Sequence, residues 1–377
     1  GPFVDTLSFV RKQSCPGCTL HCLYTTEVTS EDRLLDRTIT DMPDWEAMGM
    51  VGGNLGYLEV KGTTPADPFG GNHQDLAEGA AKTQYTTRLF DNYGLDFIEG
   101  GAMLAMLMEL RQRDLIKPDD LDGIDLQWGD VHAVDELMKK VIKREGIGKV
   151  LASGTWETAR HFSQTKSNPE IMYYSQTAHR YAQPAHGARS NKDRNALEYV
   201  TVVRPGEHTG GGKGGFMSTP IDFKAAVQGQ NTNATVNSMV YCIFAGGDWG
   251  DEGNVELVKA VTGWSDFDKK SFLQVGERAY ALTRLFNLYA QGIKDPRKEW
   301  DTLDMFPRRW FEEPLPNGPF KGKAAFEGDP SKLFDQTLPE YWKTRGWSED
   351  KGIPTPQKLK ELAIADIAEK VAVKLRS

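Results

Sequence analysis

The sequence predicts a mainly helical protein made of two domains. Apolar residues recur at helical spacing along much of the chain, whereas strand-like runs are few. A length of 377 residues favours two or three domains. Apolar residues at 39% and charged residues at 26% are typical of a globular protein. We therefore expect two helical domains, divided near residue 165 into residues 1–165 and 166–377.

Five stretches carry the helical signal: 98–113, 134–143, 149–161, 275–289 and 355–375. The first follows a Gly-Leu-Asp turn and ends in Arg-Gln-Arg, cations suited to a helix C-terminus. Its segment 102–110 is apolar but too short to span a bilayer, which predicts a buried helix. The second stretch is amphipathic and should stop at Gly146-Ile147-Gly148. The last reads as two short helices that begin with Thr355-Pro356.

The remaining segments carry weaker signals. The run 199–203 is rich in β-branched residues and predicts a short strand. Between residues 167 and 215 the pattern is irregular, and glycine gathers at 206–212, which favours a long functional loop. The segment 301–328 is rich in Pro, Gly and aromatic residues and is expected to wrap the surface.

Four cysteines, and only four, occur in the chain. Cys15, Cys18 and Cys22 form a C-x2-C-x3-C triplet, and Cys242 lies far along the sequence. Four thiolates are what a [4Fe-4S] cluster needs. A zinc site usually combines two C-x-x-C pairs, and only one is present here. Disulfides or unrelated buried thiols are further alternatives, but a signal peptide is not recognisable and four cysteines are few for a disulfide scaffold. The spacing favours an iron–sulfur cluster over a zinc site, and we expect the sulfurs of all four cysteines to surround one cluster.

Charge and hydropathy exclude several classes of protein. The net charge is −8, the pI is about 5.5, and no block of Lys and Arg suggests a nucleic-acid surface. No apolar run reaches the ~18 residues of a membrane span. We expect a cytoplasmic protein.

Several motifs, taken in order, resemble the tungsten-containing aldehyde ferredoxin oxidoreductase family in its second and third domains. They begin with the cysteine triplet and continue with Asp91-Asn92-Tyr93-Gly94-Leu95-Asp96, Arg144-Glu145-Gly146-Ile147-Gly148, Gly276-Glu277-Arg278 and Arg345-Gly346-Trp347. Each piece is weak by itself, but their order across nearly the whole chain is specific. The resemblance implies two helical domains that enclose a tungsten or molybdenum bis-pterin at their junction, with a [4Fe-4S] cluster beside it.

The resemblance also implies roles for particular residues. Asp91, Gly94, Leu95 and Asp96 match a DxxGLD motif that contacts the pterin, although spacing alone favours Asp96 as the N-cap of the following helix. Asn237 opens the stretch Asn237-Ser238-Met239-Val240-Tyr241-Cys242, which matches the second pterin motif, roughly DxxGLC. The cysteine of that motif is kept, but its Asp, Gly and Leu are not, so the pterin contact on this side is open.

Catalytic candidates come from the same resemblance. His208 follows a segment similar to the one before the family's active-site histidine, and a histidine can exchange protons near neutral pH. A surface histidine in a glycine loop is the alternative reading, and His186 is the second candidate. Asp44 and Glu46 match a segment of the family with an active-site glutamate, and which of the two corresponds to it stays open. The alternative is that both are solvent-exposed residues at the start of a helix.

The implied function is oxidation of a small-molecule aldehyde to a carboxylic acid, with ferredoxin or an Fe–S partner subunit taking the electrons. The alternatives are the catalytic subunit of an aryl-CoA reductase and a non-catalytic electron-transfer subunit. The family's β-rich N-terminal domain, which covers the pterins, has no counterpart in these 377 residues. We therefore expect that domain on the rest of a longer chain or on a separate chain, and leave a homo-oligomer open.

Overall fold

The computed structural model describes residues 9–21, 23–36, 39–42, 48–57, 73–184, 196–207, 210, 222–246, 249–293, 307–315, 321–324 and 330–376. Contacts within the chain divide it into two compact units, Gly1–His186 and Gly187–Ser377. Residue 165, where the sequence suggested a boundary, ends a helix of the first unit. The division of the chain at that residue stays a prediction.

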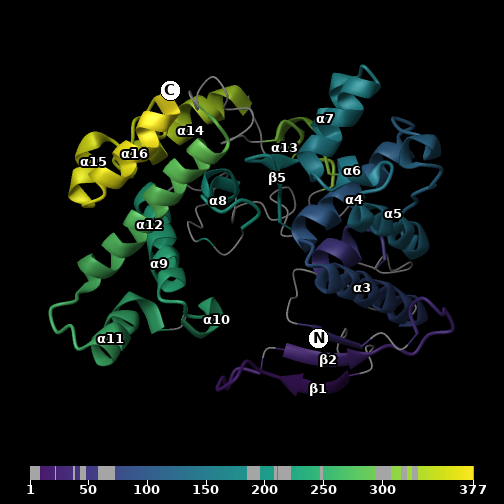
Figure 1. Ribbon diagram of the computed structural model, residues 1–377, viewed down its shortest axis with the longest axis horizontal. Helices are drawn as coiled ribbons and strands as arrows, with labels where there is room; N and C mark the ends of the chain where they lie inside the picture. The colour runs from purple at the N-terminus through teal and green to yellow at the C-terminus, as the bar shows by residue number, and fades with distance from the viewer. Residues whose placement is uncertain are drawn as a thin grey trace. The chain divides into compact units, whose positions relative to one another are not determined.

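The first unit combines a small sheet with a helical body (Figure 1). Its strands are β1 (Phe9–Gln13), β2 (Leu23–Glu27), β3 (Ile39–Met42), β4 (Thr177–Ala178) and β5 (Tyr181–Ala182). Its helices are α3 (His73–Tyr93), α4 (Phe97–Gln112), α5 (Val131–Lys143), α6 (Gly148–Leu151) and α7 (Thr155–Thr165), with shorter helical turns at Met48–Gly53, Pro118–Leu121 and Pro169–Tyr174. Strands β1, β2 and β3 form an antiparallel sheet in that order, and β4 pairs with β5 as a hairpin.

The sheet is joined to α3 by a buried polar contact. The Thr26 hydroxyl on β2 donates to Gln84 Oε1 on α3 at 2.7 Å, and both residues are buried. On β2, Tyr24 pairs with Met42 of β3, and Gln13 at the end of β1 pairs with Leu23. The turn between β1 and β2 therefore presents the residues that follow Gln13, which include the first two cysteines of the triplet.

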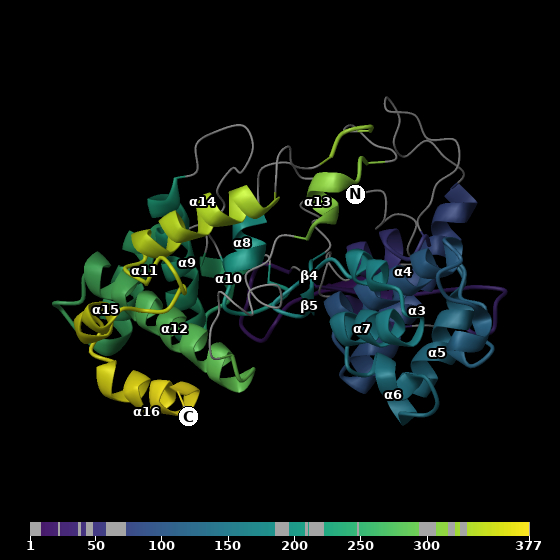
Figure 2. The ribbon, with the colours of Figure 1, turned by 90° about the horizontal axis from the view of Figure 1, so that it is seen from above.

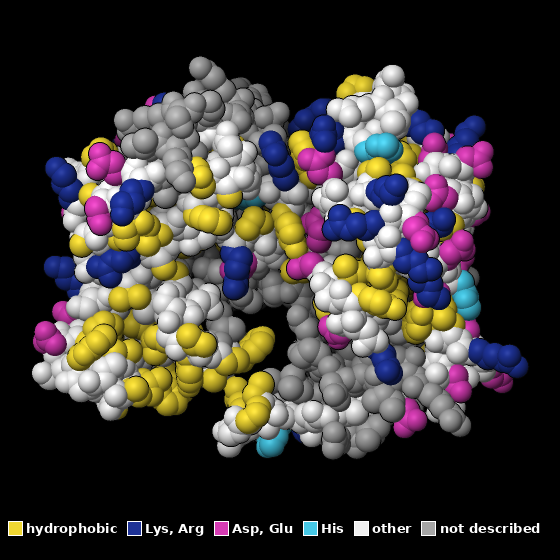
Figure 3. Space-filling view, in the orientation of Figure 1, with side chains coloured by type: hydrophobic (Ala, Val, Ile, Leu, Met, Phe, Trp, Pro, Cys, Tyr) yellow, Lys and Arg dark blue, Asp and Glu magenta, His cyan; other side chains and the backbone are white. Residues whose placement is uncertain are grey.

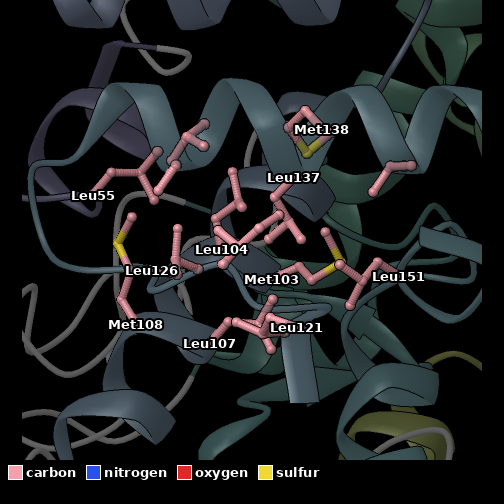
Figure 4. Close-up of a cluster of buried hydrophobic side chains, with 14 of the residues drawn as sticks. Leu55, Met103, Leu104, Leu107, Met108, Leu121, Leu126, Leu137, Met138 and Leu151 are labelled. Carbon is pink, nitrogen blue, oxygen red and sulfur yellow. The ribbon is translucent and has the colours of Figure 1, made fainter. Parts of the chain in front are cut away.

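The core of the first unit is formed mainly by α4 and α5 (Figure 4). Helix α4 is apolar on nearly all sides, and Met103, Leu104 and Leu107 are almost fully buried. Leu137 and Met138 of α5 complete the cluster from the facing helix. Burying a side chain of this size contributes about 1.5–3 kcal/mol, so this cluster gives α4 a fixed position. The pterin-motif match lies directly before α4 and is positioned by it.

The second unit is built around two long helices. Its elements are α8 (Ala196–Thr201), α9 (Phe223–Ser238), α10 (Ile243–Gly246), α11 (Gly250–Thr262), α12 (Lys269–Ala290), α13 (Arg309–Glu312), α14 (Pro330–Thr344), α15 (Pro356–Glu361) and α16 (Ala365–Arg376). Helices α9 and α12 lie side by side in Figures 1 and 2, with α14 packed on α9 and α16 on α12. A Cβ at Gly276 would lie 1.8 Å from the Asn231 carbonyl oxygen, so glycine permits this close packing.

A buried arginine connects α14 to both long helices. Arg345 is 1% exposed, and its guanidinium carbon lies 3.8 Å from the centre of the Tyr280 ring on α12. Its Nε donates to the Tyr341 hydroxyl at 2.6 Å, and its Nη atoms donate to the side chains of Gln230 and Asn231 on α9. Removing one member of such a network leaves buried polar groups unsatisfied, so the network fixes the positions of Gln230 and Tyr280.

The mainly helical fold class is confirmed, and the buried helix over 102–110 and the two terminal helices are present. The strand expected at 199–203 is wrong, because residues up to Thr201 belong to α8. Leu197 and Val200 lie three residues apart and are both fully buried, so packing overrides the strand preference of β-branched residues. The stretch 149–161 is two helices, interrupted at Gly154, whose φ is +89°.

The region expected to be irregular, 167–215, contains the helical turn Pro169–Tyr174, the β4–β5 hairpin and α8. None of the helices that the structure describes is both long and apolar enough to cross a membrane.

Candidate functional site

Cys15 and Cys18 lie on a tight turn between β1 and β2. The Cys18 amide donates to the Cys15 carbonyl oxygen at 3.0 Å, and Gly17 has a φ of +77°. Pro followed by Gly at the centre of the turn supplies the backbone angles of a type II turn. The Leu20 amide donates to Cys18 Sγ at 3.4 Å. Both thiols are free, with Cys15 exposed and Cys18 partly buried, so the turn presents two sulfurs as soft ligands.

The other two cysteines are not placed against this turn. Cys22 lies outside the described residues, and Cys242 is a free, exposed thiol in the second unit, directly before α10. Within the described part of the chain, no group of three His, Cys, Asp or Glu residues is arranged to hold a metal ion. The donor types of Cys15 and Cys18 suit an iron–sulfur cluster, and the convergence of all four thiolates stays a prediction.

The segment Asp91–Asp96 forms the junction between α3 and α4. The Gly94 amide donates to the Asp91 carbonyl at 3.1 Å and the Leu95 amide to the Phe90 carbonyl at 2.9 Å, while Gly94 has a φ of +63°. This closes the C-terminus of α3. Asp96 Oδ1 then accepts the Glu99 amide at 2.9 Å, which confirms that Asp96 caps α4.

This junction is open on its outer side. A Cβ built on Gly94 would meet no atom within 4 Å. Asp91 is exposed, although partial burial of its carboxyl still raises its pKa. An exposed carboxylate beside accessible backbone can accept N–H donors from a flat heterocycle. The geometry of these residues is therefore compatible with a pterin contact.

A cavity of about 430 Å³ begins at this junction; we call it the first cavity. Leu95, Asp96 and Glu99 line it, together with Arg144, Arg180 and Tyr181. Its apolar wall consists of Phe90, Met103, Met138, Val141, Ile142 and Leu151. Burial and a hydrogen bond to the Asp96 carboxylate raise the pKa of Tyr181 well above the usual tyrosine value, so this hydroxyl stays protonated and donates.

Glu99 joins three elements at the edge of this cavity. One carboxylate oxygen accepts the Ala182 amide of β5 at 2.8 Å, and the other accepts the Thr155 amide at the start of α7. Burial raises the pKa of Glu99, and these two backbone hydrogen bonds act in the opposite direction. Because both oxygens are already bonded, Glu99 has a structural role in holding α4, α7 and the hairpin together.

A second cavity, of about 460 Å³, lies within the second unit. Asn237 lines it with Gln230 from α9, and Tyr280, Phe286 and Asn287 line it from α12. Arg204, Glu207 and Gly210 also contribute, and these residues flank His208. The structure therefore brings Asn237 and the neighbours of His208 to one cavity.

The side chains of four predicted histidine and carboxylate candidates lie outside the described residues. They are Asp44, Glu46, His186 and His208. Each of the two stretches that match a pterin motif lines a cavity of its own unit. Leu95 and Asp96 line the first cavity, and Asn237 lines the second. The prediction that Asp91, Asp96 and the segment 237–242 share one site stays a prediction.

Sequence reasoning missed several residues that line these cavities. Arg144 lies inside a stretch quoted for the resemblance but was not assigned a role, and Asn287 was not singled out. Glu99 could have been suspected as the third residue after an N-cap Asp. Arg180 carries no sequence signal, because it enters the first cavity through a tertiary contact of the hairpin.

A third feature of the second unit is an apolar groove of about 570 Å³. Met239, Tyr241, Val261, Trp264 and Phe267 are among its lining residues. Val261 is 78% exposed and Trp264 is 58% exposed, and apolar side chains gather in this part of the second unit in Figure 3. Apolar exposure on this scale is typical of surfaces that contact another protein.

Comparison with known proteins decides the family. The family model described as aldehyde ferredoxin oxidoreductase, domains 2 and 3, matches residues 4–364. The chain belongs to this family. A tungsten-containing aldehyde ferredoxin oxidoreductase of Pyrococcus furiosus is 31% identical over 373 residues, which cover 95% of this chain and 53% of the relative. An aliphatic sulfonate oxidoreductase, WOR-like subunit, from the same organism is 30% identical, with coverage of 94% and 50%. The chain thus spans about half the length of these two relatives.

One solved structure resembles the fold over nearly the whole chain. It is the active-site complex BamBC of benzoyl coenzyme A reductase in complex with 1,5-dienoyl-CoA, with a TM-score of 0.67 and 15% identity. The match covers 98% of this chain and 55% of that chain. At this identity the likeness concerns the fold alone, and it agrees with the mainly helical architecture of the aldehyde ferredoxin oxidoreductase family.

The left-handed turn at Gly17 gives a direct test of the cysteine site. Gly17→Ala should reduce bound iron, because a Cβ at a φ of +77° strains the turn that presents Cys15 and Cys18, by about 1–2 kcal/mol. Iron and acid-labile sulfide per chain are the measurement. Gly123→Ala is the matched control, since Gly123 has a φ of +88° and, like Gly17, open space around its Cβ position. Equal iron loss in both variants would contradict a specific role for the turn.

Glu99 should make stability depend on pH. Because folding raises its pKa, its contribution is fully present below the pKa of an unfolded glutamate and is lost as the pH rises through the folded value. Glu99→Gln cannot ionise, so its deficit in unfolding free energy relative to wild type should shrink between pH 4 and pH 8. Urea unfolding at several pH values measures this difference. A deficit that grows with pH would show that the charged form is the one the fold favours.

Proposed function

We propose that this chain forms the part of a tungsten–pterin oxidoreductase that contacts the cofactor and binds the cluster. The enzyme oxidises an aldehyde to a carboxylic acid. The family match over residues 4–364 carries this proposal. The turn that presents Cys15 and Cys18 and the open junction at Gly94 support it, since both lie in stretches that resemble the family's motifs.

The reaction balances as aldehyde plus water giving carboxylic acid, two protons and two electrons. When bound, the metal–pterin group supplies the two-electron chemistry and the cluster passes electrons singly to ferredoxin or an Fe–S partner subunit. The chain's own contribution is placement. Asp91 and Asp96 would accept N–H groups of the pterin, and the Gly94 backbone would lie against it. Cys15, Cys18, Cys22 and Cys242 would hold the cluster.

His208 is the proposed proton carrier. Its neighbours Glu207 and Gly210 line the second cavity with Asn237, which stands in the second motif. An imidazole there could accept one of the two protons that the oxidation releases. Asp44 or Glu46 would orient water or substrate.

Benzoyl-CoA-type reduction is the second candidate. The observation that favours it is the replacement of Asp by Asn237 in a cavity with aromatic walls formed by Tyr280 and Phe286. Such a wall suits an aromatic substrate, and a lost carboxylate changes the contact with the cofactor. A non-catalytic electron-transfer subunit is the third candidate.

The chain is also proposed to act with further protein. The curated relatives are about twice as long, and one of them is named as a subunit. An additional β-rich domain or chain would exclude water from the cofactor, which strengthens the electrostatic interactions at the reacting centre. The apolar groove beside Met239 and Trp264 offers a surface for such a contact.

Metal analysis of the purified complex tests the proposal. Four irons with one tungsten or molybdenum per chain are expected for the enzyme. Iron without tungsten or molybdenum would support the electron-transfer subunit instead, and zinc alone would overturn the assignment of the cysteines. Turnover with aldehydes against turnover with aryl-CoA thioesters then separates the first two candidates.

Substitution of His208 tests the proton carrier. His208→Ala should lower kcat by ~10²–10⁴-fold, the usual loss for an acid–base group, while metal content stays unchanged. Steady-state kinetics with metal analysis on the same preparation is the measurement. His161→Ala, on α7 of the other unit, is the control and should keep wild-type turnover. Wild-type kcat in His208→Ala would remove this residue from the reaction.

A further inference from the structure

We propose that the first cavity is a binding site for an organic carboxylate with an apolar body, whose charge is held by Arg180 and Arg144. This inference goes beyond the proposed function, because it concerns the chain without metal or pterin. If the proposed function also holds, the acid product belongs to the same chemical class.

The two arginines of the first cavity are not paired with the two carboxylates that line it. Arg180 and Arg144 both line it, and neither forms an ion pair with a carboxylate in the described part of the chain. The two acidic residues of the lining are already engaged. Asp96 accepts the Glu99 amide as the cap of α4, and Glu99 accepts the Thr155 and Ala182 amides. An oxyanion entering the cavity would therefore meet two guanidinium groups without displacing an existing ion pair.

Arg180 is held there by a strained turn. It follows His179 in the two-residue loop between β4 and β5. The φ value is +55° at His179 and +59° at Arg180. Glycine or asparagine normally occupies such a loop, because a side chain in this region is strained by about 1–3 kcal/mol. The hairpin itself gives no reason for an arginine at this position.

The guanidinium of Arg180 also has an unmet hydrogen bond. Its Nε is buried and has no acceptor among the described residues. A buried donor without a partner is unfavourable by about 1–3 kcal/mol. The guanidinium carbon lies 4.8 Å from the centre of the Trp156 ring, which restricts its orientation. This ring contact orients the guanidinium, and a carboxylate bound in the cavity would give Arg180 the ion-pair partner that the described residues do not supply.

Arg160 provides an internal comparison. Its guanidinium carbon lies 5.6 Å from the centre of the same Trp156 ring. Unlike Arg180, it forms an ion pair with Glu157, at 2.5 Å from Nη2 to Oε2, and it does not line the cavity. Two arginines thus contact one indole ring, and the one without a carboxylate partner is the one that lines the cavity.

The remaining wall selects the body of the ligand. Phe90, Met103, Val141 and Leu151 make one side of the cavity apolar. A cavity of about 430 Å³ is within the range of small-molecule sites, roughly 300–1,000 Å³. A hydrated inorganic anion would gain nothing from this wall, whereas an aromatic or aliphatic carboxylate would bury its hydrocarbon part.

Calorimetric titration of the metal-free 377-residue chain with phenylacetate tests the proposal. Saturable binding is expected for phenylacetate but not for phenylacetamide, which has the same body without the charge, nor for inorganic phosphate. Arg180→Gln should weaken the binding by ~10-fold or more, the loss typical of one charge-assisted hydrogen bond. Arg160→Gln, the matched control, should bind phenylacetate as wild type does.

A second variant separates binding from folding. Arg180→Gly removes the guanidinium and suits the left-handed turn, so it should lose phenylacetate binding without a lower thermal midpoint. A folded wild-type chain that does not bind phenylacetate, equal binding of phenylacetamide, binding of phosphate alone, or unchanged binding in Arg180→Gln would each overturn the proposal. Because no metal is present in this titration, such a failure is distinct from a failure of the metal analysis.

Discussion

The first cavity depends on the hydrogen bonds of the partly buried carboxyl group of Glu99. Its two oxygens accept backbone amides from the start of α7 and from β5, while its own backbone belongs to the first turn of α4. Three segments that are far apart in sequence are thus fixed to one side chain. A carboxyl group in this position accepts hydrogen bonds from amides that a helix start and a short hairpin would otherwise leave without an acceptor. Because Glu99 also lines the first cavity, its hydrogen bonds fix part of the cavity wall beside the junction at Gly94.

In the second unit a buried arginine, Arg345, joins separate helices in a similar way. Arg345 donates to the side chains of Tyr341, Gln230 and Asn231 and lies against the ring of Tyr280. Gln230 and Tyr280 then line the second cavity with Asn237. In each unit one ionisable side chain, surrounded by hydrogen bonds, fixes groups around a cavity. Such groups are sensitive to substitution, because either partner left alone is a buried polar group without a bond.

Features set by local sequence could be predicted, and features set by contacts between distant segments could not. The cap at Asp96, the buried helix around Met106 and the two terminal helices each follow from a short pattern. The strand expected at 199–203 was wrong because Leu197 and Val200 pack as one face of a helix. The cysteine triplet was recognised from its spacing, but the β1–β2 turn that carries Cys15 and Cys18 was not predicted. The entry of Arg180 into the first cavity depends on a hairpin with no distinctive sequence.

The amide of Leu20 makes the two described cysteines of the triplet electronically unequal. It donates to Cys18 Sγ, whereas no such donor reaches Cys15 Sγ among the described residues. A hydrogen bond to a thiolate withdraws negative charge from the sulfur and raises the reduction potential of the iron that it binds. If these cysteines hold a cluster, the Leu20 amide would lower the charge on the Cys18 sulfur relative to the Cys15 sulfur. The β1–β2 turn would then adjust the reduction potential of the bound group as well as hold it.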